Sequence, residues 1–207
     1  MDSSSWDERY AGHEYLWEVA PNRFVEKHLA SLPPGTAIDL GAGEGRNTVW
    51  LAQQGWQVTA VDFSGVGLAK ARQLAADHGV ASSVETVLAD VLDYEPVRSV
   101  DLVVIAYLQL PAPDVRTILG HGAIWLKLGG TLLVVAHDRS NLALGHGGPS
   151  TEEVCYDVDS TVAALAGLEV DTAVVVKRDA ETPEGIRTAL DTLVIAHGPI
   201  ASERNRT

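Results

Sequence analysis

The sequence predicts an α/β fold built on a mostly parallel sheet, and three observations support that prediction. Short apolar runs alternate with amphipathic helical segments, which is typical of consecutive strand–helix–strand units. The run 101–106 is unbroken in its apolar residues, so we expect it to lie centrally in the sheet. The last two runs, 168–177 and 188–197, flank a turn at 182–185 and predict an antiparallel hairpin.

The first half of the chain alternates helices and strands with clear boundary residues. Pro21 suits the first turn of a helix, and Pro33-Pro34-Gly35 ends it. Gly55 ends the helix that follows the first strand, and Ser64 is a good N-cap for the next helix. We therefore expect helices over residues 21–32, 46–54 and 64–75, and strands over residues 37–40, 57–61 and 84–88.

The second half continues the alternation of helices and strands and then changes to a long loop and a hairpin. After the run 101–106 we expect a helix over 114–128, which Gly129-Gly130 ends, and a strand over 131–136. A glycine-rich loop extends from the end of this strand to about residue 153, and loops of this length in compact domains are usually functional or mobile. A short helix over 159–166 precedes the hairpin.

The composition indicates one globular domain. At 207 residues, of which 46% are hydrophobic and 21% charged, we expect residues 1–207 to form a single domain. The net charge of -13 disfavours a nucleic-acid partner, because phosphate contacts need clustered Lys and Arg. A lone cysteine, Cys155, suits a reducing compartment. No apolar run is long enough to span a bilayer, and the N-terminus lacks a secretory signal. We expect a cytoplasmic monomer or homodimer without membrane attachment.

Residues 36–47, TAIDLGAGEGRN, form the predicted ligand-binding loop, in which a buried strand ends at glycines on alternate positions: Gly41, Gly43 and Gly45. Glycine lets the backbone approach a ligand closely and permits positive φ. A dinucleotide motif GxGxxG would need its third glycine where Arg46 stands, and the carboxylates of Asp39 and Glu44 would repel a pyrophosphate. A phosphate-free cofactor with a cationic end, such as S-adenosylmethionine, suits these carboxylates.

The end of the second strand supplies a further carboxylate. Asp62 lies 21 residues after Gly41, close to the roughly 20 expected for an acidic residue that accepts hydrogen bonds from ribose hydroxyls. The alternative role, an N-cap for the following helix, suits Ser64 better. Phe63 is expected either against the adenine or in the core.

Together these residues resemble motif I of the class I S-adenosylmethionine-dependent methyltransferases, D-x-G-x-G-x-G, read here as Asp39, Gly41, Gly43 and Gly45. The aromatic N-terminus, the GEGRN extension and the GGP-containing loop are similar to the small bacterial branch of tellurite-resistance and thiopurine methyltransferases. The resemblance implies a Rossmann-like seven-stranded, mostly parallel sheet with helices on both faces and a C-terminal antiparallel hairpin. It also implies a cofactor site made of Asp39, Gly41, Ala42, Gly43, Gly45, Arg46, Asp62, Phe63, Asp90, Val91, Ala106, Trp6 and Tyr10.

Two parts of that implied site have alternatives. Asp90 matches the residue that accepts from the adenine amino group in the family, but a side chain at this position also caps turns. Trp6 and Tyr10 match a W-x-x-x-Y segment that covers the cofactor, which makes residues 1–20 a cap or lid. Plain packing of a terminal helix is the alternative.

The reaction implied by the resemblance is methyl transfer to a small-molecule acceptor. His137 follows a strand at the ligand edge and is the candidate base, because an imidazole titrates near neutral pH; a surface histidine would look the same. Tyr107 is expected to line the acceptor pocket, and residues 137–153 form the substrate-facing loop. We expect no metal site, since His137, Asp138 and His146 contain no helix-spaced pair. An NAD(P)-dependent reductase and a non-catalytic S-adenosylmethionine-binding protein are the alternatives.

Overall fold

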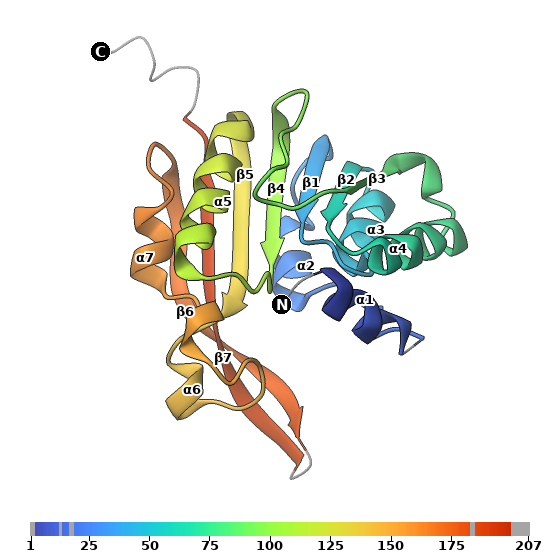
Figure 1. The fold of residues 1–207 in the computed structure, drawn as a ribbon. Coiled ribbons are helices and arrows are strands. Elements are labelled where there is room, and N and C mark those ends of the chain that lie inside the picture. Colours follow the sequence, from blue (N-terminus) through green and yellow to red (C-terminus); the bar gives the residue numbers. More distant parts are fainter. Residues whose placement is uncertain (1–2, 13, 17–18, 183–184, 200–207) are drawn as a thin grey trace. The chain divides into compact units, whose positions relative to one another are not determined.

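The computed structural model describes residues 3–12, 14–16, 19–182 and 185–199, and its strands follow the order β3-β2-β1-β4-β5-β7-β6 in a seven-stranded sheet (Figure 1). The helices are α1 (Ser3–Ala11), α2 (Arg23–Leu29), α3 (Arg46–Gln53), α4 (Gly65–Asp77), η1 (Ala81–Ser83), α5 (Ala112–Trp125), α6 (Asn141–Leu144), η2 (Glu152–Val154) and α7 (Val158–Ala163). The strands are β1 (Thr36–Leu40), β2 (Gln57–Asp62), β3 (Val84–Leu88), β4 (Val100–Ala106), β5 (Leu126–His137), β6 (Glu169–Thr182) and β7 (Gly185–His197).

The chain divides into two compact units, Met1–Val104 and Ile105–Thr207. In the first unit β1, β2 and β3 are parallel, with Leu40 opposite Val61 and Asp62 opposite Leu88. This register brings the carboxyl ends of β1 and β2 together, so the glycine loop after β1 and the side chain of Asp62 lie at one edge of the sheet. Helix α1 packs against α4 within the same unit (Figure 1).

In the second unit β7 runs antiparallel to both β5 and β6. β7 pairs with β5 from His197 opposite Thr131 to Asp191 opposite His137, and β6 pairs with β7 along its whole length. The hairpin of β6 and β7 therefore extends beyond the end of β5, and α6 lies beside its distal half (Figure 1). Strand β7 delivers the buried carboxylate of Asp191 to the end of β5.

The predicted α/β class, the seven-stranded Rossmann-like sheet and the C-terminal antiparallel hairpin are confirmed. The prediction of a helix reaching Leu128 was wrong: α5 ends at Trp125 and β5 begins at Leu126. The physical reason is pairing, because Gly198 N donates to Gly130 O at 2.8 Å and Gly129 N donates to Pro199 O at 3.2 Å, so the two glycines take part in sheet hydrogen bonding.

Three other boundaries differ from the prediction. Helix α2 begins at Arg23, because the side chain of Asn22 accepts from the amides of Phe24 and Val25 and caps it. The hairpin strands are longer than predicted: β6 continues to Thr182 and β7 begins at Gly185, and the added residues are mostly polar and exposed, so they lack the apolar alternation that predicts a strand. The loop over residues 137–153 contains the short helices α6 and part of η2.

Among the described residues, no helix is long and apolar enough to cross a membrane. Localisation in the cytoplasm, the single-domain organisation of residues 1–207 and a monomeric or homodimeric state stay predictions. The expected cap over residues 1–20 includes positions 1–2, 13 and 17–18, which lie outside the described residues.

Candidate functional site

The glycine loop of the first unit is closed by its own hydrogen bonds. Gly41 N and Ala42 N both donate to Val61 O, at 2.8 and 3.0 Å, and Gly45 N donates to Ala42 O at 3.0 Å. Gly43 N donates to Asp62 Oδ2 at 2.8 Å. All three glycines have positive φ, which favours glycine at each position. These amides are already paired within the protein, so they are not the donors that a pyrophosphate needs.

Asp62 fixes the loop with both carboxylate oxygens. Oδ2 accepts from Gly43 N, and Oδ1 accepts from Ser64 N at 2.8 Å. The side chain is buried, and burial raises its pKa, while the bonds from Ser64 and Gly43 favour the charged form. A carboxylate accepts about four hydrogen bonds, so acceptor capacity remains after these two. Contact with a ribose stays a prediction for Asp62.

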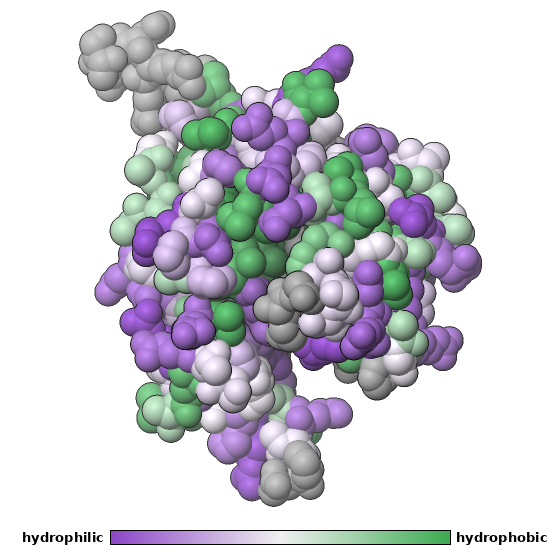
Figure 2. Space-filling model, viewed as in Figure 1, coloured by the Kyte–Doolittle hydropathy of each residue, from purple (hydrophilic) through white to green (hydrophobic). Residues whose placement is uncertain are grey.

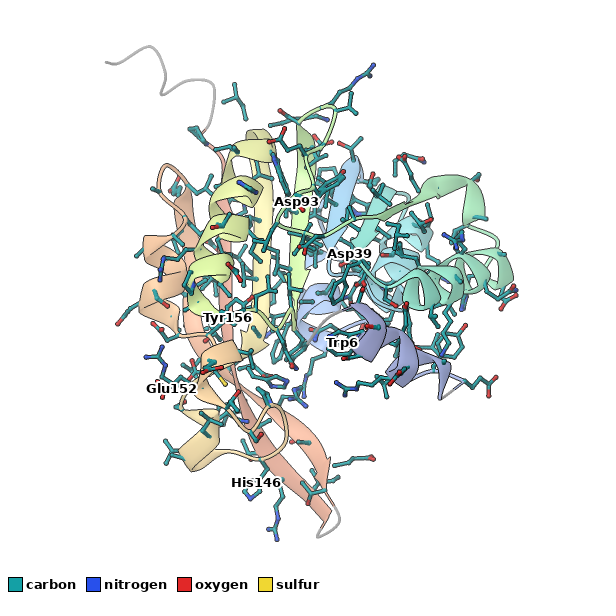
Figure 3. The ribbon with its side chains drawn as sticks, in the orientation of Figure 1. Trp6, Asp39, Asp93, His146, Glu152 and Tyr156 are labelled. Atoms are coloured by element: carbon teal, nitrogen blue, oxygen red, sulfur yellow. The ribbon has the colours of Figure 1, made fainter. Side chains whose placement is uncertain are left out.

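Asp39 lies in β1 and is 1% exposed (Figure 3). Burial raises its pKa to about 6, although the hydroxyl of Thr48 donates to Oδ2 at 2.6 Å and the charge of Arg46 also favours ionisation. The nearby carboxylate of Asp62 raises the pKa further. The loop thus contains two buried carboxylates close enough to interact, a local environment that favours a cationic ligand.

Substitution of Gly45 by alanine tests how tightly the loop packs on α4. A Cβ at Gly45 would lie 2.6 Å from Ala71 Cβ and 2.9 Å from Ala71 Cα, at φ +84°. Gly79 also has positive φ, +70°, but its Cβ would meet nothing within 4 Å. Both alanine variants incur the left-handed backbone cost, and we expect Gly45→Ala to lose about 1–3 kcal/mol more in urea unfolding because of overpacking. Equal losses in the two variants would contradict this packing.

Helix α1 contacts the loop through Tyr10. The Tyr10 ring is buried, and its hydroxyl oxygen lies 2.7 Å from the place where a Cβ of Gly43 would stand. Trp6 lies on α1 (Figure 3). Its ring centroid is 5.4 Å from that of Tyr10, and the guanidinium of Arg9 lies over the Trp6 ring. The structure therefore brings both predicted cap aromatics onto α1, and Tyr10 onto the loop.

Glu44 fastens the N-terminal segment to the loop, a role that the sequence did not suggest. Its carboxylate accepts from Leu16 N at 2.9 Å and from Lys70 Nζ at 2.9 Å. Lys70 Nζ also donates to Tyr10 O at 2.6 Å. One turn earlier in α1, Asp7 Oδ1 accepts from the Ser64 hydroxyl. These bonds link α1, the loop and α4.

Lys70→Met tests that link. The variant keeps most of the aliphatic stem and removes the ammonium group that Tyr10 O and Glu44 share. Because the ion pair is partly exposed, we expect a loss of less than about 1 kcal/mol in global stability. Limited proteolysis should nevertheless cleave the N-terminal 20 residues faster than in wild type. Lys27→Met, in the exposed face of α2, is the control and should leave the cleavage rate unchanged.

The other predicted cofactor residues lie at or just after the ends of β2, β3 and β4. Asp90 is exposed, and its side chain accepts from Leu92 N at 3.0 Å, so the turn-capping alternative describes its contacts here. Val91 is buried beside it, Phe63 is half-buried directly after Asp62, and Ala106 is the last residue of β4. A role in adenine binding stays a prediction for Asp90, Val91 and Phe63.

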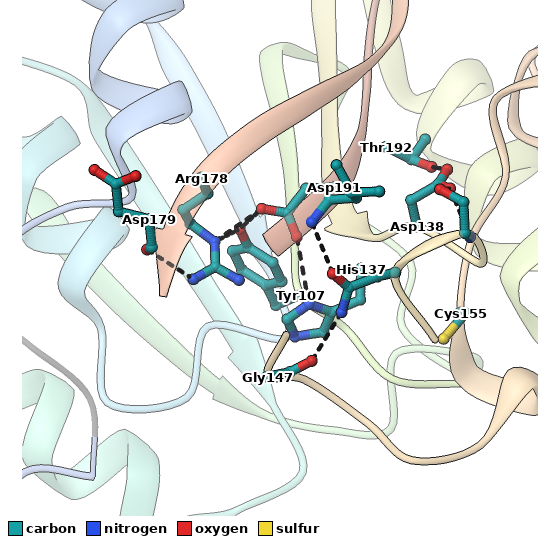
Figure 4. A network of polar contacts seen from close by, with 12 residues as sticks. Tyr107, His137, Asp138, Gly147, Cys155, Arg178, Asp179, Asp191 and Thr192 are labelled. Atoms are coloured by element: carbon teal, nitrogen blue, oxygen red, sulfur yellow. Dashed lines mark hydrogen bonds and ion pairs between the residues drawn. The ribbon is translucent and has the colours of Figure 1, made fainter. Parts of the chain in front are cut away.

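In the second unit, Tyr107 and His137 belong to one polar network with two residues that the sequence reasoning missed (Figure 4). Asp191 Oδ2 accepts from Tyr107 Oη at 2.7 Å and from Arg178 Nε at 2.8 Å. Its Oδ1 lies 3.3 Å from His137 Nδ1. The rings of Tyr107 and His137 are 4.7 Å apart at their centroids. Asp191 is fully buried, and it connects three side chains from three strands or strand ends.

Asp138 and His146 do not join this network. Asp138 accepts from Ser140 N at 2.8 Å and from the Thr192 hydroxyl at 2.6 Å, and His146 lies exposed beside the hairpin (Figure 3). Within the described ranges, no group of three or more His, Cys, Asp or Glu side chains is placed to bind a metal ion.

Comparison with known proteins adds the following similarities. Residues 37–130 match the family described as "Methyltransferase domain". The chain is 26% identical over 137 residues to a ubiquinone biosynthesis O-methyltransferase of Stutzerimonas stutzeri, covering 65% of this chain and 59% of that protein. It is 32% identical over 110 residues to a ribosomal RNA small subunit methyltransferase C of Alcanivorax borkumensis, covering 50% and 33%. The chain thus spans one third to three fifths of the length of these relatives.

Solved structures share the fold at low sequence identity. The N-methyltransferase NodS of Bradyrhizobium japonicum, in complex with S-adenosyl-L-homocysteine, superposes with a TM-score of 0.72 at 17% identity, covering 95% of this chain and 98% of that one. TehB of Haemophilus influenzae gives a TM-score of 0.74 at 18% identity, covering 93% and 67%.

Proposed function

We propose that this chain, in which residues 37–130 match a methyltransferase domain family, is a class I S-adenosylmethionine-dependent methyltransferase that transfers a methyl group from S-adenosylmethionine to a small-molecule acceptor. When bound, S-adenosylmethionine supplies a methyl group that its sulfonium already activates for nucleophilic attack. The net charge of -13 supports a small acceptor rather than a nucleic acid.

The observation that supports this cofactor best is the hydrogen bonding of the glycine loop. The amides of Gly41, Ala42, Gly43 and Gly45 donate to Val61, Asp62 or Ala42, which leaves the loop without these donors for phosphate oxygens. Asp39 and Asp62 place two carboxylates in the same region. A cationic, phosphate-free adenosine derivative fits this set of groups, and a dinucleotide does not.

Each predicted residue has a proposed role in holding the cofactor. Asp62 would accept hydrogen bonds from the ribose hydroxyls, and the carboxylate of Asp39 would attract the ammonium group of the cofactor. Phe63, Asp90 and Val91 would contact the adenine. The remaining contacts would come from the loop, the start of α3, α1 and the end of β4, through Gly41, Ala42, Gly43, Gly45, Arg46, Trp6, Tyr10 and Ala106.

For the acceptor, we propose that His137 is the base, that Tyr107 shapes the acceptor pocket, and that residues 137–153 form the substrate-facing loop. Apolar side chains lie exposed over α6 in this loop (Figure 2), where Leu142 and Leu144 are 42% and 74% exposed. Exposed apolar side chains at a predicted ligand-facing segment support contact with an organic acceptor. The acceptor itself stays undetermined.

Calorimetry with S-adenosylhomocysteine, followed by product detection across thiol, amine, phenol and oxyanion acceptors, tests the proposal. We expect binding of S-adenosylhomocysteine, no binding of NADH, and a methylated product with at least one acceptor class. Binding of NADH without S-adenosylhomocysteine would support a reductase. Binding of S-adenosylhomocysteine without any product would support a non-catalytic binding protein.

A further inference from the structure

We propose that Asp191 is a positioning residue that orients His137 and sets its tautomer, so that Nε2 accepts a proton from a hydroxyl or amine acceptor. The inference about the acceptor rests on the proposed methyltransferase function. The inference about Asp191 and His137 rests on the geometry of the second unit alone.

One side of the Asp191 carboxylate is fixed by two donors. Oδ2 accepts from Tyr107 Oη at 2.7 Å and from Arg178 Nε at 2.8 Å, and Arg178 Nε also lies 3.1 Å from Tyr107 Oη (Figure 4). Both partners are donors to this oxygen, so a hydrogen-bond acceptor is required at the Oδ2 position. The carboxylate therefore has a defined orientation, with Oδ1 directed to His137.

The other side of the carboxylate meets the imidazole. His137 Nδ1 and Asp191 Oδ1 are 3.3 Å apart, within ion-pair distance, and neither atom has a hydrogen-bond partner among the described residues. A Cβ at Gly148 would lie 2.8 Å from Nδ1, so the loop backbone closes that side of the ring. Catalytic hydrogen bonds are often poorly aligned before substrate binds. Since an ionised carboxylate only accepts, the tautomer that we propose has the proton on Nδ1 and leaves Nε2 as the basic nitrogen.

The charges of the network balance between Asp191 and Arg178. Burial alone would raise the pKa of Asp191, but the contacts with His137 and Arg178 keep that pKa below its usual value, so the carboxylate is ionised. Arg178 neutralises it, and the Asp191 and Tyr107 contacts raise the pKa of the guanidinium despite its partial burial. One cation therefore balances one anion in this network, and the proposed base needs an imidazole without a proton on Nε2.

Tyr107 is held in a strained conformation that serves this arrangement. Its φ is +56°, which is unfavourable for a bulky residue, and it is the one non-glycine residue with positive φ in the described part of the chain. Such strain persists where surrounding contacts determine the conformation and is concentrated at functional sites. Here the backbone amide donates to Val135 O at 2.7 Å, and the hydroxyl reaches Asp191.

An oriented, partly buried base has a consequence for the acceptor. A thiolate is already ionised and gains little from a base, whereas a hydroxyl or an ammonium still carries a proton. In the proposed step the O–H or N–H proton passes to Nε2, and the bonding pair stays on the acceptor atom as the attacking lone pair. This pair would form the new bond to the methyl carbon as the methyl–sulfur bond breaks and leaves its electrons on sulfur, so that S-adenosylhomocysteine is the leaving group. The acceptor class is therefore a molecule whose nucleophile is a hydroxyl or an amine.

Asp191→Asn tests the positioning role, because the network dictates how the new amide must lie. Its carbonyl oxygen must face Tyr107 Oη and Arg178 Nε, so its NH₂ group must donate to His137 Nδ1. The imidazole proton then moves to Nε2, and the base is lost. We expect ¹⁵N-detected NMR, with the signal assigned by its absence in His137→Gln, to show Nδ1–H in wild type and Nε2–H in Asp191→Asn.

Activity supplies the second readout. With a catechol or an aliphatic amine as acceptor, Asp191→Asn should lower kcat at least about 100-fold with little change in KM, whereas turnover of an acidic aromatic thiol should change little. Asp179→Asn is the matched control, because it makes the same change at an exposed carboxylate next to Arg178. Its kcat and KM should equal those of wild type. S-adenosylhomocysteine affinity should stay unchanged in both variants.

The outcomes separate the two levels of the proposal. Nε2–H in wild-type protein, which needs no variant to fold, or an unchanged tautomer in Asp191→Asn, would overturn the positioning role. Methylation of the thiol alone by wild type would overturn the acceptor class while leaving a methyltransferase. If wild type binds no S-adenosylhomocysteine, the proposed function fails, and the tautomer measurement still decides the role of Asp191.

Discussion

Asp62→Ala is expected to weaken S-adenosylhomocysteine binding by roughly 1.5 to 3 kcal/mol, or about 10- to 150-fold, because it removes charge-assisted hydrogen bonds. The carboxylate accepts from Gly43 N and Ser64 N, so the substitution also leaves the loop without a hydrogen-bond acceptor that it uses in the structure. Isothermal titration calorimetry measures the change. Asp77→Ala removes an exposed carboxylate at the end of α4 and should leave the affinity unchanged.

A comparison of two adenosine ligands, with and without ribose hydroxyls, separates the loop-fixing role of Asp62 from its proposed contact with the ribose. Wild type should bind adenosine more tightly than 2′,3′-dideoxyadenosine, and in Asp62→Ala that preference should disappear. If the preference survives in the variant, Asp62 fixes the loop and the ribose hydroxyls bind elsewhere. Unchanged affinity for S-adenosylhomocysteine would show that the ribose assignment is wrong.

The loop and Asp62 could be predicted from the sequence because their relationship follows from local periodicity. Strand β1 ends at Leu40, directly before Gly41, and β2 ends at Asp62; parallel pairing in register brings any two such ends to the same edge. The fold class was predictable for the same reason. The boundary between α5 and β5 was not, because sheet pairing of Gly129 and Gly130 with residues after β7 overrides the tendency of glycine to end a helix.

The partners of His137 were not predictable, because they depend on the register of a hairpin. Asp191 lies opposite His137 only because β7 pairs with β5 in the observed register, and Arg178 comes from β6. A signal was nevertheless present, since Asp191 stands within the apolar run of β7 and a charged residue there needs a buried partner. The link from Glu44 to Lys70 spans 26 residues and has no comparable local signal.

Asp39→Asn is expected to stabilise the protein above about pH 6. Burial raises the pKa of Asp39 to about 6, whereas a carboxyl of this type in an unfolded chain titrates at about 3.9. Between these values the folded protein binds the proton more tightly than the unfolded chain, so the contribution of this group to stability is fully present below about pH 4 and is lost as the pH rises through about 6. Asparagine has no such dependence.

The size of the effect follows from the difference between the two pKa values. The two pKa values differ by about 2, and each tenfold change in proton affinity corresponds to about 1.4 kcal/mol. We therefore expect Asp39→Asn to raise the free energy of unfolding by about 3 kcal/mol at pH 8 and by little at pH 4. The amide oxygen can still accept from the Thr48 hydroxyl, which now bonds Asp39 Oδ2. Urea unfolding between pH 4 and 8 measures the gain, and Asp77→Asn is the exposed control. A difference between variant and wild type that does not change with pH would contradict the buried titration.

A carboxylate that destabilises the folded protein at neutral pH implies a use for its charge. If Asp39 interacts with the cationic end of the cofactor, the ligand stabilises the ionised form, so wild-type affinity for S-adenosylhomocysteine should rise with pH until Asp39 is fully ionised and then level off. In Asp39→Asn the affinity should be lower at pH 8, and the rise due to this group should be absent. Calorimetry at pH 5, 6, 7 and 8 measures both. If the stabilised variant binds as tightly as wild type at pH 8, the cationic group lies away from Asp39, and its carboxylate acts only through Thr48 and the loop.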